Sequence, residues 1–198
     1  HGQIRRQRQM CIRDSPRITN AVPKPVLSAT QLREQTSRRA AAGLGYNECV
    51  SYSFIDENSA KLFGGGDAST QLENPISSEM SHMRPDLFPG LLQAASRNQA
   101  RGFFNMALFE LGPVFNGGDP GNQQNNLSGV LIGQTASKDV HGQNREVDVF
   151  DVKCHIENIL SLIGAPSKFQ ILRGAESHWH PGRHGRICLG PKKTIGIF

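Results

Sequence analysis

The segment HWHPGRH, residues 178–184, is the densest concentration of residues able to do chemistry. Three imidazoles this close together could hold a zinc ion, and Arg183 and the nearby Arg186 could each contact a phosphate or a carboxylate. The segment itself has no cysteine or carboxylate to complete a zinc site, and its Pro-Gly turn accounts for it without a metal. We therefore predict no metal site. His180, Arg183 and Arg186 are our candidates for contacts with a ligand or a partner.

Carboxylates are the candidates for acid–base chemistry: Glu73, Glu79, Asp86 and Glu110. None is spaced from a histidine or a second carboxylate as a catalytic dyad would be, so we predict no catalytic residue. Glu110 differs from the others because it lies in an otherwise apolar stretch, NMALFELGPVF. A buried carboxylate needs a cationic partner. The candidates for a structural ion pair with Glu110 are Arg84, Arg97 and Arg101.

Periodicity predicts the elements that position these residues. Helices are expected from about Thr30 to Gly43 or Gly45, at 56–63, over 86–101 and over 150–164. Strands are expected at 49–54, 105–115, 127–135 and 168–174, followed by a hairpin across Pro191. This order favours an α+β fold built around a mostly antiparallel sheet.

Two of the expected strands differ in their patterns. In residues 49–54 a small polar or thiol side chain alternates with Val50, Tyr52 and Phe54, which is the pattern of a strand with one buried face. In residues 105–115 both faces are largely apolar, so this strand should be central. Between them, Asn74, Pro75 and Pro85 predict that residues 73–85 form a turn and loop.

Composition indicates a globular protein without a membrane span. Of the 198 residues 37% are hydrophobic and 20% are charged, and no apolar run is long enough to cross a bilayer. The formal net charge is +5, but its basic part is at the start of the chain: residues 1–40 hold nine Lys/Arg and two acidic residues, and the remainder holds thirteen and fifteen. Four scattered cysteines form no CxxC pair, and no secretory signal is recognisable, so we expect a cytoplasmic protein.

Residues 1–15 show no periodicity and are interpreted as a foreign or disordered tail. Pro23 and Pro25 lie in an extended connector, and residues 16–30 are interpreted as a linker from a preceding domain that the chain lacks. Residues 31–198 then form one module. Its last predicted strand runs to Phe198, from which we expect truncation at the C-terminus.

Several blocks, in the same order, resemble one family. They are GYNECVSYSFID, ENPISSEMSHMRPDLFPGLLQAASRNQARG, ALFELGPVF, VDVFDVKCHIENILSLIGAP and HPGRHGRICLG. Together they strongly resemble the catalytic-like module of the β subunit of bacterial phenylalanine–tRNA ligase, over about residues 16–198. The resemblance implies a class II aminoacyl-tRNA synthetase-like antiparallel sheet flanked by helices. It also implies that this module is not catalytic and supports assembly with the α subunit.

The resemblance assigns a role to two stretches. ELGPVF is similar to the strand on which active class II enzymes place an arginine against the ATP α-phosphate, but here Asn116 follows Phe115, so adenylate formation is not expected. The loop NPISSEMSHMR is expected to face a partner, with Arg84 as its anchor. The interface candidates are Asn74, Pro75, Ser77, Ser78, Met80, Met83 and Arg84.

The resemblance also implies the partners and cofactors of the holoenzyme. Its partners would be the α subunit, a second αβ pair in an (αβ)2 assembly, and tRNA for phenylalanine, with no membrane. No cofactor is expected on this chain, since ATP and Mg²⁺ would be bound by other domains and by the α subunit. Two alternatives remain open: a stand-alone RNA-binding module that uses the basic N-terminus, and an ATP-dependent amino-acid-activating enzyme that uses Glu110, Arg183 and Arg186.

Overall fold

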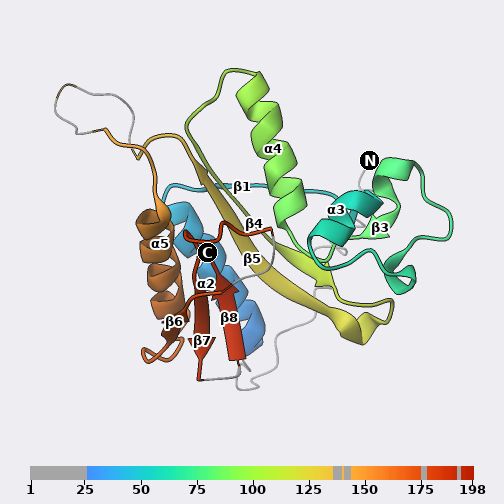
Figure 1. Ribbon diagram of the computed structural model, residues 1–198. Helices are drawn as coiled ribbons and strands as arrows, with labels where there is room; N and C mark the ends of the chain where they lie inside the picture. Colours follow the sequence, from blue (N-terminus) through green and yellow to red (C-terminus); the bar gives the residue numbers. More distant parts are fainter. Residues whose placement is uncertain (1–25, 136–139, 141–143, 175–177, 191–192) are drawn as a thin grey trace, which may run out of the picture.

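The computed structural model describes residues 26–135, 140, 144–174, 178–190 and 193–198 (Figure 1). Residues 1–25, with the expected tail and most of the expected linker, lie outside the described residues. The central sheet has the order β1–β4–β5. β1 (Asn47–Glu48) runs parallel to β4 (Met106–Phe115), and β4 pairs antiparallel with β5 (Gln123–Ile132) along its whole length.

β4 has the central place in its sheet that its two apolar faces predicted. Leu108, Phe109 and Val114 are buried, with β1 on one side of the strand and β5 on the other. Because side chains alternate along a strand, Leu108 and Phe109 lie on opposite faces. Each face is therefore covered by different helices.

Helix α4 (Phe88–Ala100) covers the Leu108 face. Its buried Leu91 and Ala95 form a core cluster with Leu108, packed against Met106 and Val130. The helix tolerates Pro89 because a proline in the first turn removes no intrahelical hydrogen bond.

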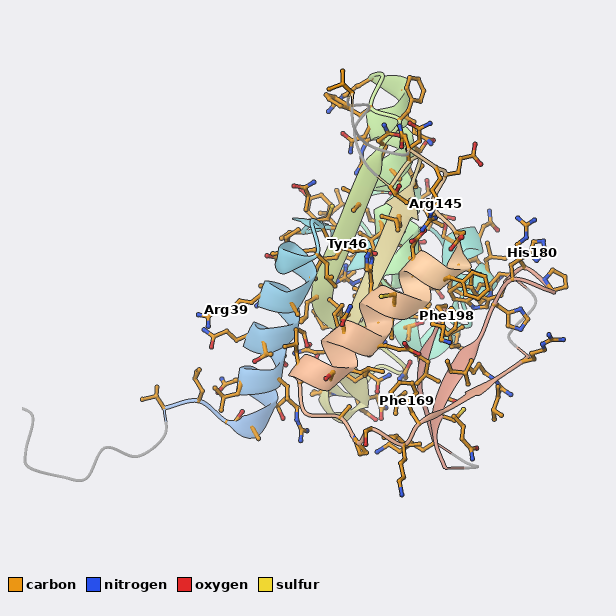
Figure 2. All side chains as sticks on the ribbon, turned by 90° about the vertical axis from the view of Figure 1, so that its left-hand side faces the viewer. Arg39, Tyr46, Arg145, Phe169, His180 and Phe198 are labelled. Atoms are coloured by element: carbon orange, nitrogen blue, oxygen red, sulfur yellow. The ribbon has the colours of Figure 1, made fainter. Side chains whose placement is uncertain are left out.

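Helices α2 (Ala29–Gly43) and α5 (Val149–Leu162) lie side by side, and Figure 2 shows Tyr46 near both. Both begin with a capping box, Ser28 with Gln31 in α2 and Asp148 with Asp151 in α5. These local signals set where each helix begins.

Smaller elements complete the structure. β2 (Phe54–Ile55) pairs antiparallel with β3 (His82–Met83), and α3 (Glu57–Leu62) lies between them in the chain. Three short 3₁₀ helices span Ala68–Thr70, Ser78–Met80 and Pro120–Asn122. A second antiparallel sheet has the order β6 (Gln170–Leu172), β7 (Arg186–Leu189), β8 (Lys193–Ile197).

Some expected elements differ from those observed. The strand expected at 49–54 is reduced to the two short ladders of β1 and β2, because the segment between them bonds to side chains and to isolated carbonyls instead of a continuous strand. The expected C-terminal hairpin is present as β7 and β8, although Pro191 lies outside the described residues. Among the described helices, none has the length and apolarity to cross a membrane.

Candidate functional site

A buried polar cluster links three separate segments of the chain. Arg84 and Glu110 are each 3% exposed. Arg84 Nη1 donates to Glu110 Oε1 at 2.7 Å and to Ser51 Oγ at 2.9 Å, while Arg84 Nε donates to the carbonyl of Pro113 at 2.9 Å. Ser51 Oγ donates to Glu110 Oε2 at 2.6 Å. The cluster therefore holds the 50–54 segment and the residue after β3 against β4.

Two glycines leave room for this cluster. A Cβ on Gly112 would lie 2.8 Å from Arg84 Nη2, and one on Gly90, in α4, would lie 2.9 Å from Ser51 Cβ. Real Cβ atoms essentially never come this close to a neighbour, so a side chain at either glycine would displace Arg84 or Ser51. The arrangement is that of a buried structural ion pair.

The geometry selects one of the three candidate partners of Glu110 and corrects one other expectation. Glu110 pairs with Arg84, whereas Arg97 lies near Cys49 and Arg101 caps the exposed end of α4. Arg84 was also expected to anchor a partner, but a guanidinium that is buried and bonded within its own chain presents nothing to a partner. The physical reason is that a buried carboxylate is stable only with a cation close by. Arg84 directly follows β3, and this position places its guanidinium beside Glu110.

The rest of the expected interface loop is divided by exposure. Asn74, Pro75, Ser77 and Ser78 are exposed, whereas Met80 and Met83 are half-buried. Met83 pairs with Phe54 in the β2–β3 ladder. Ile76 lies between the exposed Pro75 and Ser77. At 97% exposure it is the most exposed large hydrophobic side chain of the described residues. The tip of the loop is therefore exposed to solvent, whereas the end that carries Met80 and Met83 is packed into the fold.

We define an apolar edge as Val50, Tyr52 and Phe54, and Phe54 adjoins the loop through its pairing with Met83. Val50 is 93% exposed and Tyr52 is 74% exposed, whereas Phe54 is 38% exposed. The alternation predicted one buried face. The structure turns the small one inward and half-buries it, because Ser51 bonds to Glu110 and the carbonyl of Ser53 accepts from the Arg84 N–H. The larger apolar side chains therefore point outward, which the alternation alone could not decide.

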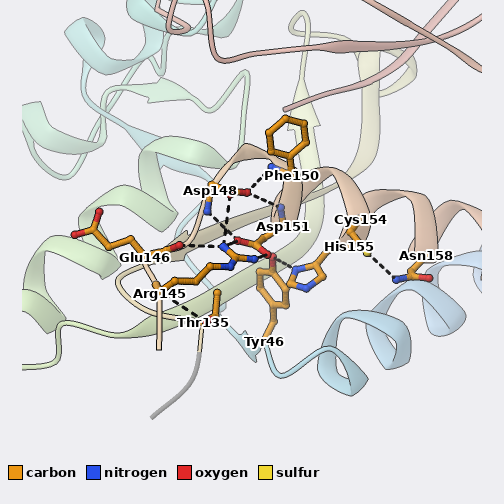
Figure 3. A network of polar contacts seen from close by, with 10 residues as sticks. All are labelled: Tyr46, Thr135, Arg145, Glu146, Asp148, Phe150, Asp151, Cys154, His155 and Asn158. Atoms are coloured by element: carbon orange, nitrogen blue, oxygen red, sulfur yellow. Dashed lines mark hydrogen bonds and ion pairs between the residues drawn. The ribbon is translucent and has the colours of Figure 1, made fainter. Parts of the chain in front are cut away.

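Tyr46 and His155 form a contact that the sequence did not indicate (Figure 3). Tyr46 Oη lies 2.9 Å from His155 Nδ1, and the two rings meet edge to face. Asp151, one turn earlier in α5, accepts two hydrogen bonds from Arg145, and these bonds lower the pKa of Asp151 to about 2. Partners 109 positions apart give no local sequence signal.

The environment of Tyr46 makes a titration measurable. Burial, and secondarily the negative charge of Asp151, raises the pKa of Tyr46 from 10.0 to about 12. The neutral phenol is therefore favoured in the folded state, and its contribution to stability is complete below pH 10 and lost as the pH rises from 10 to 12.

We predict that a Tyr52→Phe chain, in which Tyr46 is the remaining tyrosine, ionises with a midpoint near 12 when tyrosinate absorbance is followed. N-acetyltyrosinamide in the same buffers supplies the reference midpoint. A protein midpoint equal to that reference, with the fold intact by circular dichroism, would contradict the burial of Tyr46.

In the histidine-rich segment 178–184, the imidazoles of His180 and His184 form hydrogen bonds with the backbone. His180 Nδ1 accepts from the Gly182 N–H, and His184 Nε2 accepts from the Gly174 N–H while its Nδ1 donates to the carbonyl of His180. Within the described ranges no group of three or more His, Cys, Asp or Glu could hold a metal. His180 and Arg183 are exposed, whereas Arg186 is half-buried in β7.

Comparison with known families gives a match to one family model over residues 16–198. The model describes the phenylalanyl-tRNA synthetase β-chain CLM domain. The chain belongs to this family.

Relatives of this β-chain domain agree with the family model. The chain is 63% identical to the phenylalanine–tRNA ligase β subunit of Ruegeria pomeroyi, over 94% of the chain and 23% of that protein. It is 59% identical to the same subunit of Cereibacter sphaeroides, over 89% of the chain and 22% of that protein. The chain thus spans less than a quarter of the length of these relatives.

Solved structures confirm the fold class of the β-chain domain. Pyrrolysyl-tRNA synthetase of Desulfitobacterium hafniense superposes with a TM-score of 0.54 at 14% identity, covering 92% of this chain and 59% of that one. A protein of Bacillus halodurans described as an ATP phosphoribosyltransferase regulatory subunit/histidyl-tRNA synthetase gives 0.51 at 12% identity, covering 79% and 41%. The α+β class II synthetase fold is therefore confirmed.

The end of β4 in this β-chain domain carries an amide. Asn116 is exposed, and its backbone N–H donates to the carbonyl of Asn122 at 3.0 Å in the turn before β5. A Cβ on Gly117 would lie 2.7 Å from the Asn122 side-chain nitrogen, so this turn is tightly filled. This end of β4 therefore presents an exposed amide in front of a closely packed turn.

Proposed function

We propose that this chain is a non-catalytic core module of the phenylalanine–tRNA ligase β subunit, which binds the α subunit in the cytoplasm and so supports ATP-dependent attachment of phenylalanine to its tRNA. The observation that carries the proposal is the apolar edge, with Val50 93% and Tyr52 74% exposed on a segment that is rigidly held from inside. Membership of the β-chain family supplies the identity of the partner.

The apolar edge has the features of a surface that a partner covers. Aromatic and apolar side chains are enriched at the centres of protein interfaces, where each large buried side chain contributes most. β1, which leads into this segment, is an edge strand of its sheet. Ser51 and Arg84 fix the backbone behind the exposed side chains, so ordering them on binding costs little conformational entropy.

The buried cluster and the end of β4 support a non-catalytic role. The Glu110 carboxylate is already bonded to Arg84 and Ser51, which leaves it unavailable as a base or a nucleophile. Asn116 offers no charge to a phosphate. ATP and Mg²⁺ would then be bound by other parts of the holoenzyme, and tRNA and a second αβ pair would be partners of the whole assembly.

The two alternative functions gain no structural support of their own. The basic N-terminal segment proposed for RNA binding lies largely outside the described residues. Amino-acid activation was to use Glu110, which the ion pair with Arg84 engages. Pyrophosphate exchange by the purified chain remains the direct assay for the second alternative.

We predict that Tyr52→Ser weakens association of the chain with a bacterial phenylalanine–tRNA ligase α subunit by about tenfold or more, because a large aromatic contact near an interface centre is lost. The two chains would be co-expressed, and the complex measured by size-exclusion chromatography with light scattering and by titration of the separated chains. Val50→Ser should weaken it in the same direction.

Phe104→Ser is the matched control, because Phe104 is 66% exposed on the loop between α4 and β4 and lies outside the apolar edge. Its association should equal that of the wild type. An α complex that forms equally well with Tyr52→Ser and Val50→Ser, while both variants fold normally by circular dichroism, would count against the apolar edge as the binding surface.

A further inference from the structure

A cavity of about 470 Å³ lies between β5, α5 and the β7–β8 end of the chain. Its walls come from separate parts of the fold, and they include Tyr46, Phe88, Phe109, Val152, Trp179 and Phe198. Figure 2 shows Phe198 beside α5, with Tyr46 farther up the same side of the molecule. This volume is within the range of small-molecule sites, about 300–1,000 Å³.

Aromatic rings form one wall of this cavity and are fixed by contacts with each other. Trp179 meets Phe88 edge to face with ring centroids 5.3 Å apart, and Phe88 stacks on Phe63 at 6.4 Å. His178 contacts both Phe63 and Trp179. Such a wall is rigid before a ligand arrives, and it offers flat faces and edges to another aromatic ring.

The charged groups along the cavity are not balanced. The Asp148 carboxylate is engaged, since it accepts from the N–H groups of Phe150 and Asp151 and lies 3.5 Å from Arg145. Tyr46 and His155 bond to each other. Arg183 also lines the cavity, and within the described residues its guanidinium has no carboxylate partner. An anionic group on a ligand would supply one.

We propose that this cavity binds a flat aromatic molecule of about the size of two fused rings that carries one anionic group. The ring system packs between the Phe88–Trp179 wall and the aliphatic side chains of β5 and α5, and the anion pairs with Arg183. This inference is separate from the apolar edge and does not depend on assembly with the α subunit, because none of the three edge residues lines the cavity.

The single tryptophan of the chain makes the proposal directly testable. Trp179 gives one indole N–H signal in a ¹H–¹⁵N correlation spectrum, and this ring belongs to the cavity wall. Naphthalene-2-carboxylate, titrated into the 198-residue chain, should shift that signal saturably, with a dissociation constant on the order of 1 mM or below. Naphthalene-2-carboxamide, which lacks the charge, should bind about tenfold more weakly.

Two pairs of variants locate the bound probe. Val152→Phe fills the cavity and should abolish the saturable shift, whereas Leu162→Phe, on the exposed end of the same helix, should leave it unchanged. Arg183→Gln should weaken the carboxylate about tenfold and leave the carboxamide unaffected, with Arg173→Gln as the control at an exposed arginine outside the cavity.

The outcomes divide cleanly between support and rejection. A Trp179 signal that does not move at saturating probe overturns the proposal, as does a saturable shift that Val152→Phe leaves intact. Equal affinities of the carboxylate and the carboxamide would overturn the assignment of the anion to Arg183. Loss of α binding through Tyr52→Ser has no bearing on any of these results, so failure of the proposed function and failure of this inference are distinguishable.

Discussion

Arg84→Ala is expected to lower the free energy of unfolding by about 3–5 kcal/mol, because it leaves the buried Glu110 carboxylate without a cation. Arg84 also donates to Ser51 and to the carbonyl of Pro113, and these acceptors would lose a donor in the same step. Chemical denaturation followed by circular dichroism measures the change. Arg97→Ala, which removes an exposed arginine of α4, should cost less than about 1 kcal/mol.

Two further variants test the cause of this loss. Arg84→Lys keeps the charge but cannot reproduce the three directed hydrogen bonds. Its free energy of unfolding should therefore lie between that of the wild type and that of Arg84→Ala. Adding Glu110→Leu to Arg84→Met removes the uncompensated charge and should recover part of the stability. If Arg84→Ala cost no more than Arg97→Ala, the ion pair would not hold the 50–54 segment in place.

Gly133→Ala is the second large effect, with an expected loss of about 2–5 kcal/mol. Gly133 follows the last residue of β5 and has φ at +89°, a region that side chains disfavour. A Cβ there would lie 2.5 Å from the carbonyl oxygen of Phe104. The Gln134 N–H also donates to Asn105 Oδ1 beside it. The Gly133 carbonyl also accepts from the Val147 N–H at 2.9 Å, which restrains this backbone.

Gly45→Ala separates the two causes, because Gly45 has the same φ of +89° and no atom within 4 Å of its Cβ position. This control should lose only the conformational penalty, about 1–2 kcal/mol. Urea midpoints of both variants measured in parallel give the difference that belongs to the close contact. Equal losses at the two positions would mean that the β5 turn relaxes freely.

The sequence determined the features that depend on neighbouring residues. Ser28 and Asp148 begin their helices by bonding to N–H groups three positions later, and this pattern is local. The two apolar faces of β4 predicted a central strand in the same local way, because the apolar character of each side chain indicates that its position is buried. The ordered blocks likewise identified the family, because they recur in a fixed sequence along the chain.

Only the tertiary structure decided the partners that are distant in the chain. Glu110 required a cation, yet three arginines met that requirement until β3 brought Arg84 to it. The alternation of the 49–54 segment predicted a buried face without saying which, and the Arg84–Glu110 pair selected the small side by bonding Ser51. Tyr46 and His155 meet because α2 and α5 pack together. Burial and pairing belong to the folded chain as a whole, so local pattern leaves them open.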